Sequence, residues 1–175
     1  KNKLKFAVIR KPLIMTKYRI EIKWSFIYTI VSLAWMVFEK EMGWHDINIS
    51  KHPLYSTLFS FIGIIIYYLA LREKKVISYN NTIHWKEAFV AGAIITVFIT
   101  ILAIPVFYLT VNVISPLFFR NMIDYAVSNK VYTVAQAESY FNTRSYLLQV
   151  IGGSLSMGIV SSAVIAYVIK TKKKS

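Results

Sequence analysis

Four long apolar stretches, separated by polar segments, dominate the chain. Runs without Asp, Glu, Lys or Arg cover residues 24–38, 53–71, 88–119 and 145–169. A hydrocarbon core about 30 Å thick needs roughly 20 helical residues to cross it. The pattern therefore predicts an all-α integral membrane four-helix bundle, formed by one membrane domain over residues 1–175. We expect its spans at about 22–42, 54–72, 86–114 and 145–169.

The third and fourth spans are joined by a connection that has helical signals of its own. Pro105 removes a backbone donor inside the third span, and we expect a kink there. Ser115 followed by Pro116 is typical of a helix start, and Thr133 with Gln136 has the spacing of a capping box. Residues 115–144 are thus predicted to form an extracytoplasmic connection with a short interfacial helix.

Basic residues are distributed unequally between the two sides of the predicted bundle. The segment before the first span, the second connection and the tail after the fourth span hold 16 of the 21 Lys and Arg residues. The first and third connections hold the other 5. Because short cytoplasmic loops are rich in Lys and Arg, both termini are expected on the cytoplasmic side. The expected location is the bacterial inner (cytoplasmic) membrane, crossed several times.

Composition supports a membrane protein over a soluble one. Hydrophobic residues make up 56% of the chain and charged residues 17%, whereas soluble domains carry about 25% charged residues. The net charge of +13 does not indicate nucleic-acid binding, because the basic residues flank apolar runs and form no groove-reading element. The absence of cysteine excludes disulfides, thiolate metal sites and cysteine nucleophiles.

Small residues recur every fourth position in the third and fourth predicted spans. Such stripes permit close helix contact in lipid, where helix association gains little from the hydrophobic effect. The two stripes can pack against each other within one bundle, which we favour, or mediate self-association. Their members are Ala88, Gly92, Thr96 and Thr100 in the third span, and Ser154, Gly158, Ser162 and Ala166 in the fourth.

A polar group follows the first predicted span. It contains residue types that bind metals or transfer protons, namely Glu39, His45, Asp46 and His52. Their spacing matches no established ligand pattern, and no glycine-rich phosphate loop or nucleophile elbow is present. The sequence therefore predicts no catalytic residue, no metal and no cofactor.

Several segments resemble a bacterial family described as domain of unknown function 4199. The likeness begins near Thr16 and is carried by EIKWSFIYTIVSLAWMVFEKEMGWHDINISKHPLY, YYLALREKK, TIHWKEAFVAG, ISPLFF and AESYFNTRSYLLQ. The resemblance implies a small four-span inner-membrane protein without an established activity. Some members are encoded near glycosyltransferases that use polyprenyl phosphate. Residues 1–14 lie outside the resemblance and are expected to be an upstream extension, because Met15 is a plausible start.

Three functions are compatible with these observations. The first is a non-catalytic accessory or assembly subunit of an envelope-associated membrane complex, with the bilayer and a membrane protein as partners. It follows from the absence of a catalytic pattern and from the uncharged spans. The second is a small transporter or carrier of an apolar or lipid-linked substrate. The third is an outward-facing metal-dependent enzyme that uses His45, Asp46 and His52.

Overall fold

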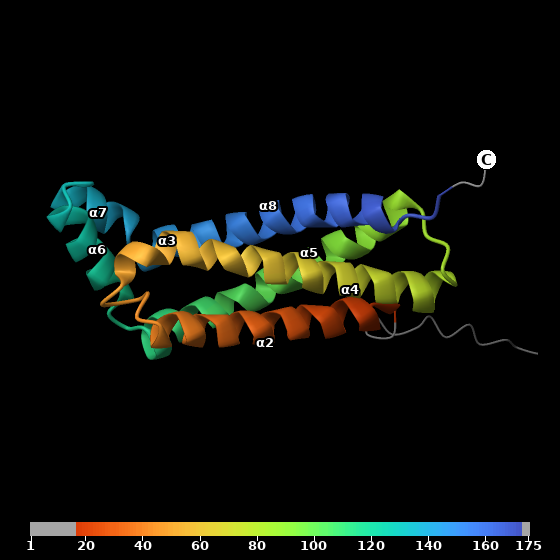
Figure 1. Ribbon diagram of the computed structural model, residues 1–175, viewed down its shortest axis with the longest axis horizontal. Helices are drawn as coiled ribbons and strands as arrows, with labels where there is room; N and C mark the ends of the chain where they lie inside the picture. Colours follow the sequence, from red (N-terminus) through yellow and green to blue (C-terminus); the bar gives the residue numbers. More distant parts are fainter. Residues whose placement is uncertain (1–16, 173–175) are drawn as a thin grey trace, which may run out of the picture.

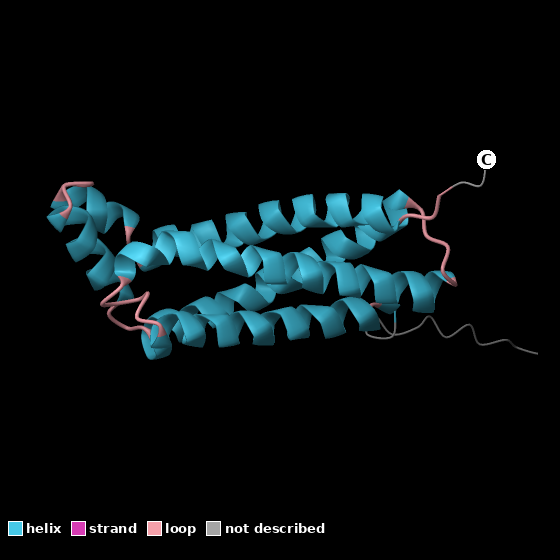
Figure 2. Cartoon of the chain, in the orientation of Figure 1, coloured by secondary structure: helices cyan, strands magenta, loops and turns pink. Residues whose placement is uncertain are grey.

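The computed structural model describes residues 17–172 as a bundle of four long helices with a small helical cap at one end (Figure 1). The long helices are α2 (Arg19–Glu41), α4 (Phe59–Tyr79), α5 (Trp85–Leu109) and α8 (Thr143–Ile169). The shorter elements are η1 (Ile49–Lys51), α3 (His52–Tyr55), η2 (Ser56–Leu58), η3 (Thr110–Ile114), α6 (Phe118–Ser128) and α7 (Val134–Tyr140). Loops occur only at the ends of the bundle in this part of the chain (Figure 2).

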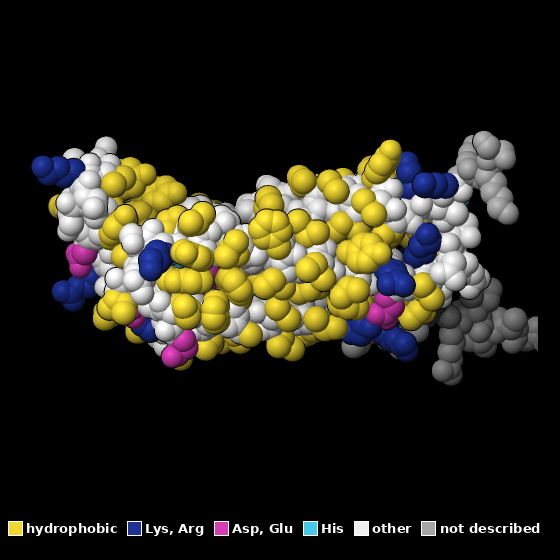
Figure 3. Space-filling view, viewed as in Figure 1, with side chains coloured by type: hydrophobic (Ala, Val, Ile, Leu, Met, Phe, Trp, Pro, Cys, Tyr) yellow, Lys and Arg dark blue, Asp and Glu magenta, His cyan; other side chains and the backbone are white. Residues whose placement is uncertain are grey.

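The predicted all-α, four-span fold is confirmed. Four helical segments of the described chain are long and apolar enough to cross a membrane, covering Arg19–Glu41, Ile49–Tyr79, Trp85–Ile114 and Thr143–Ile169. Only 17% to 33% of the residues in their most apolar windows are buried within the protein. Apolar side chains form a wide belt on the outside of the bundle (Figure 3). This surface is therefore in contact with lipid chains, since a soluble bundle would bury it.

The two ends of the bundle differ in character. We call one of them the basic end: it contains the start of α2, the end of α4, the start of α5 and the end of α8 (Figure 1). There the Nζ of Lys75 donates to the carbonyl of Ile169 at 2.8 Å and covers the last turn of α8. We call the other the cap end, because α3, α6 and α7 cover it. The extension expected over residues 1–14 lies outside the described residues.

Helices α5 and α8 make the closest contact in the bundle. A Cβ atom built on Gly92 would lie 2.5 Å from the Oγ of Ser162, and one on Gly158 would lie 2.4 Å from Cγ2 of Thr96. The two small-residue stripes thus face each other inside one chain. All of their members are buried except Ser154, which is half-buried. Hydroxyl groups in the contact donate to their own helix, as Ser162 does to the carbonyl of Gly158 at 2.6 Å.

The connection between α5 and α8 differs in detail from the sequence expectation. Helix α5 continues through Pro105 and passes into the π-helical segment η3, so the kink stays a prediction. Helix α6 begins at Phe118, and Ser115 does not cap it. The capping box of Thr133 and Gln136 is present, but α7 ends at Tyr140 and α8 has a start of its own. There the side chain of Asn142 accepts from the N–H of Ser145 at 3.0 Å.

The α5–α8 contact predicts a steric difference between two glycines of α8. Gly158→Val should lower the free energy of unfolding by about 1–3 kcal/mol, because the new methyl groups overlap Thr96. Gly152→Val is the matched control, since nothing lies within 4 Å of a Cβ at that position. The measurement is the unfolding midpoint in detergent. Equal midpoints for the two variants would contradict the close contact.

Candidate functional site

A tight turn after α2 folds the chain back over the end of that helix. Gly43 adopts φ of 73°, a left-handed conformation that favours glycine. The N–H of Trp44 then donates to the carbonyl of Glu39 at 3.0 Å. The ring of Trp44 stacks on Tyr55 with 4.5 Å between centroids. The turn thereby places His45 beside the last turn of α2 and near the start of α3.

Three polar side chains, two of them buried and one half-buried, meet at this point in the cap end. The Nε2 of His45 lies 3.0 Å from Oε2 of Glu39, and Nδ1 of His52 lies 3.6 Å from the same oxygen. Glu39 is 0% exposed and His45 is 2% exposed, while the side chain of His52 is 18% exposed. We call Glu39, His45 and His52 the His–Glu cluster. One possible ligand atom from each of them lies within 4.8 Å of the others.

A second layer of polar groups holds the cluster in place. The Nε1–H of Trp35, one turn earlier on α2, donates to Oε1 of Glu39 at 2.6 Å. The Oγ of Ser115 lies 2.6 Å from Nδ1 of His45. The Oγ of Ser56 lies 3.0 Å from Nδ1 of His52. These contacts fix the carboxylate and leave its Oε2 facing both imidazoles.

Asp46, the fourth residue of the predicted polar group, does not join the cluster. Its carboxylate pairs with Lys40 at the edge of the cap end. The hydrogen bond from Lys40, with help from the N–H of Ile47, lowers the pKa of the Asp46 carboxyl. Asp46 therefore stays ionised at neutral pH and is bound to a surface lysine, whereas the buried carboxylate of the site is Glu39.

An apolar cavity of about 210 Å³ adjoins the His–Glu cluster. Both imidazoles line it, together with apolar residues of α5 such as Val106 and Phe107. Phe118 packs its ring against His45 and His52, with centroid distances of 5.3 Å and 4.9 Å. The cluster is thus enclosed by apolar groups but has one side that faces an open volume.

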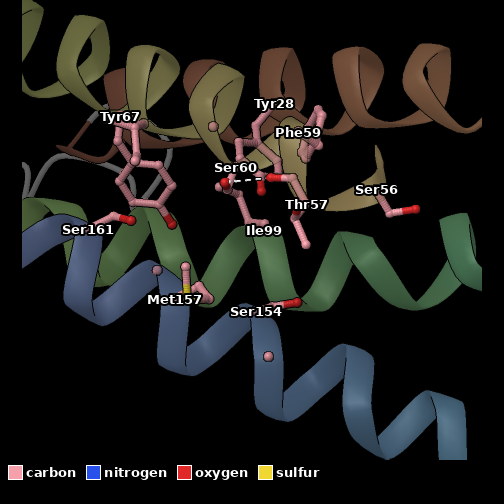
Figure 4. A pocket seen from close by; sticks show the side chains of 14 residues that line it. Tyr28, Ser56, Thr57, Phe59, Ser60, Tyr67, Ile99, Ser154, Met157 and Ser161 are labelled. Carbon is pink, nitrogen blue, oxygen red and sulfur yellow. Dashed lines mark hydrogen bonds between the residues drawn. The ribbon is translucent and has the colours of Figure 1, made fainter. Parts of the chain in front are cut away.

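A larger cavity of about 470 Å³ lies along α2, α4, α5 and α8 (Figure 4). Serine and threonine residues line much of it, but several of their hydroxyls are satisfied by their own helix. Ser60 donates to the carbonyl of Thr57 at 2.6 Å, for example. Ser56 lines this cavity and also contacts His52. Ser56 therefore connects His52 with the lining of this larger cavity, which contains no residue of the His–Glu cluster itself.

The donor set of the cluster suits a divalent transition metal ion. Zinc bound by imidazole nitrogen and carboxylate oxygen at about 2.0–2.2 Å has ligand atoms about 3.3 Å apart. The contacts of 3.0 Å and 3.6 Å to Oε2 of Glu39 are close to that spacing. Imidazole ligands favour transition metals, whereas Mg²⁺ and Ca²⁺ prefer oxygen ligands. Ser115 and Trp35 occupy the positions of the outer hydrogen-bond partners that orient such ligands.

Sequence reasoning named the three members of the cluster but not the residues that support them. Trp35 lies in the interior of the first predicted span, whereas Trp24 lies near its beginning, and an indole N–H in a span indicates that a polar partner lies nearby. Ser115 was assigned to a helix start, but it contacts a histidine 70 positions away. Such a contact has no local sequence signal, because it depends on how α5 and η3 return to the cap end.

Comparison with known proteins places the chain in one family. No curated protein and no solved structure matches it. The family model described as protein of unknown function, DUF4199, matches residues 23–171. That range includes the first span from Lys23 onward, the other three spans in full, the His–Glu cluster and the cap helices. The chain belongs to this family of membrane proteins of unknown function, DUF4199.

Proposed function

We propose that this membrane protein binds a divalent transition metal ion through Glu39, His45 and His52. The observation that carries the proposal is the close approach of the buried Glu39 and His45 and the half-buried His52, with Oε2 of Glu39 at 3.0 Å and 3.6 Å from the two imidazoles. Burying a carboxylate and two imidazoles is costly unless they are paired. A bound cation would satisfy all three groups at once.

The arrangement supports the metal-dependent enzyme among the three functions considered from the sequence. Structural zinc sites are closed by four protein ligands, whereas catalytic sites use three and keep one position for water or substrate. The cluster supplies three ligands and borders an apolar cavity of about 210 Å³. The enzyme considered from the sequence used His45, Asp46 and His52. In the metal site proposed from the structure, Glu39 takes the place of Asp46. A carrier of apolar substrates is a further candidate, favoured by the cavity of about 470 Å³.

We also propose that the cap end is extracytoplasmic in a bacterial inner membrane. Most Lys and Arg residues belong to the segments at the basic end, and short cytoplasmic loops carry this excess. The His–Glu cluster would then lie at the outer face of the membrane, where the first connection meets the second span.

The metal proposal predicts tight binding of one equivalent of Zn²⁺ by the purified full-length chain. His45→Ala or Glu39→Gln should weaken Zn²⁺ binding by at least about tenfold, since each removes one ligand and ligand loss is costly in buried sites. Acidification should weaken binding in the wild type, because protons compete for the ligand atoms. The measurement is isothermal titration in detergent, with Fe²⁺, Mn²⁺ and Mg²⁺ compared under the same conditions.

His84→Ala is the matched control for this experiment. His84 is exposed at the start of α5 in the basic end, so its loss should leave the affinity unchanged. Asp46→Asn should also bind normally, since Asp46 pairs with Lys40. If Zn²⁺ binds no more tightly to the wild type than to the Glu39→Gln variant, the proposal is wrong.

The proposed orientation can be tested by cysteine labelling, because the natural chain has no cysteine. Ser128→Cys, exposed at the cap end, should react in intact cells with a maleimide that cannot cross the inner membrane. Thr82→Cys, exposed at the basic end, should react only after that membrane is permeabilised. The opposite pattern would reverse the orientation.

A second candidate function is the accessory role in an envelope-associated membrane complex. It is favoured by exposed apolar side chains around the turn between α6 and α7, where Tyr132 is 37%, Val134 54% and Tyr140 45% exposed. We expect a membrane protein partner to contact these side chains.

The variant Val134→Asp should reduce co-purification of that partner by more than half, because it places a charge in an apolar contact. The control variant is Ser128→Asp, which adds the same charge at an exposed polar position of the cap end. A wild-type chain isolated from native membranes without a stoichiometric partner would remove this candidate.

A further inference from the structure

The basic end contains a buried carboxylate that is satisfied on one side only. Glu21 on α2 is 1% exposed. Its Oε1 accepts from the Nζ of Lys74 on α4 at 2.7 Å. Its Oε2 is buried and has no hydrogen-bond partner among residues 17–172. Leaving a buried acceptor unpaired is costly, and more so for a charged one, so a donor group is expected at this oxygen.

Glu21 lines a cavity of about 330 Å³ between α2, α4 and α5. Three lysines, a second glutamate and two tyrosines also line it, and they are Lys17, Lys74, Lys86, Glu87, Tyr18 and Tyr79. Within the described chain, neither Lys17 nor Lys86 forms an ion pair. Glu87 accepts from the N–H of His84 at 2.9 Å and is occupied by capping α5. The cavity thus has two available cations and one carboxylate oxygen that needs a donor.

The rest of the lining that α5 contributes to the cavity is apolar. Val90, Ala91 and Ile94 follow Lys86 and Glu87 along α5 and lead from the polar wall toward the middle of the span. The start of α5 lies at the depth where tryptophans gather at a membrane surface. Trp85 opens that helix, and Trp24 on α2 donates to Glu73 at 2.8 Å. A ligand in this cavity would have its polar part at the headgroup level and its apolar part along α5.

We propose that the cavity binds an anionic phospholipid whose headgroup ends in a hydroxyl. Its phosphate would be held by Lys17 and Lys86, its hydroxyl would donate to Oε2 of Glu21, and its acyl chains would lie against Val90 and Ile94. An anion is favoured because the cavity wall carries three lysines against two carboxylates. The group that donates to Oε2 of Glu21 is a neutral hydroxyl, because a second ammonium beside Lys74 would be repelled by its charge. Phosphatidylglycerol is the simplest lipid with this chemistry.

The proposal separates two contacts, and matched lipids can test each of them. Delipidated full-length protein is titrated with phosphatidylglycerol, phosphatidylethanol or phosphatidylethanolamine, and bound lipid is counted by native mass spectrometry. Phosphatidylethanol has the same charge as phosphatidylglycerol but lacks the hydroxyl. The wild type should prefer phosphatidylglycerol over phosphatidylethanol by about tenfold or more, because a hydrogen bond to a charged acceptor is lost. Phosphatidylethanolamine should bind more weakly than phosphatidylglycerol.

Variants assign the two contacts to residues. Glu21→Leu should bring the ratio between phosphatidylglycerol and phosphatidylethanol close to one, since it removes the acceptor. Lys86→Gln should weaken both lipids to a similar degree and preserve their ratio, because it removes only a phosphate contact. Lys51→Gln, which changes an exposed lysine at the cap end, is the matched control and should alter neither value.

The comparison of lipids on the wild type remains decisive if Glu21→Leu does not fold. Equal affinity for phosphatidylglycerol and phosphatidylethanol would overturn the proposal, because a water molecule would then satisfy Oε2 of Glu21. Tighter binding of phosphatidylethanolamine would also overturn it, since the donor would be an ammonium. This site lies at the opposite end of the bundle from the His–Glu cluster, so its outcome is independent of metal binding.

Discussion

The close contact between α5 and α8 determines the arrangement of the other helices. In lipid, helices associate through packing and polar contacts and gain little from burying apolar surface. Gly92 and Gly158 allow the two backbones to approach until Ser162 and Thr96 fill the space of the missing side chains. Tyr67 of α4 donates or accepts a hydrogen bond with Thr96 at 2.8 Å, so the second span docks against the same pair. Helix α2 then packs on α5 through Ser25, whose hydroxyl lies 3.3 Å from the carbonyl of Ile95.

The same lipid environment confines the chain's charged groups to the ends of the bundle. A charge at the centre of a span is expensive, so buried ionisable groups are tolerated where protein partners and water are near. At the basic end, Glu21 pairs with Lys74 and Glu73 pairs with Lys23. At the cap end, Glu39 is buried among Trp35, His45 and His52. Each end thus contains a buried carboxylate. The neighbours of Glu39 are imidazoles, whereas the neighbour of Glu21 is a lysine.

This difference supports separate roles for the two ends. Imidazoles beside Glu39 form a donor set suited to a transition metal ion, and the neighbouring cavity is mainly apolar. Lysines around Glu21 form a set suited to a phosphate, and the cavity there extends along the apolar face of α5. The cap end would thus bind an ion and the basic end a lipid. Helix α6 covers the first of these sites, since its residue Phe118 packs on both histidines.

The sequence by itself determined the fold class and the number of spans. Long apolar runs and the need to satisfy every backbone group inside the helix leave little choice in a membrane. The sequence also indicated the small-residue stripes, because residues four positions apart in one helix lie on the same face of it. It could not show that Glu39, His45 and His52 converge while Asp46 turns away to Lys40, since this depends on the turn at Gly43. Nor could it show that Ser115 contacts His45, or that Oε2 of Glu21 has no hydrogen-bond partner within residues 17–172. Those features arise where segments distant in the chain meet, and only the tertiary structure decides which side chains lie within reach of one another.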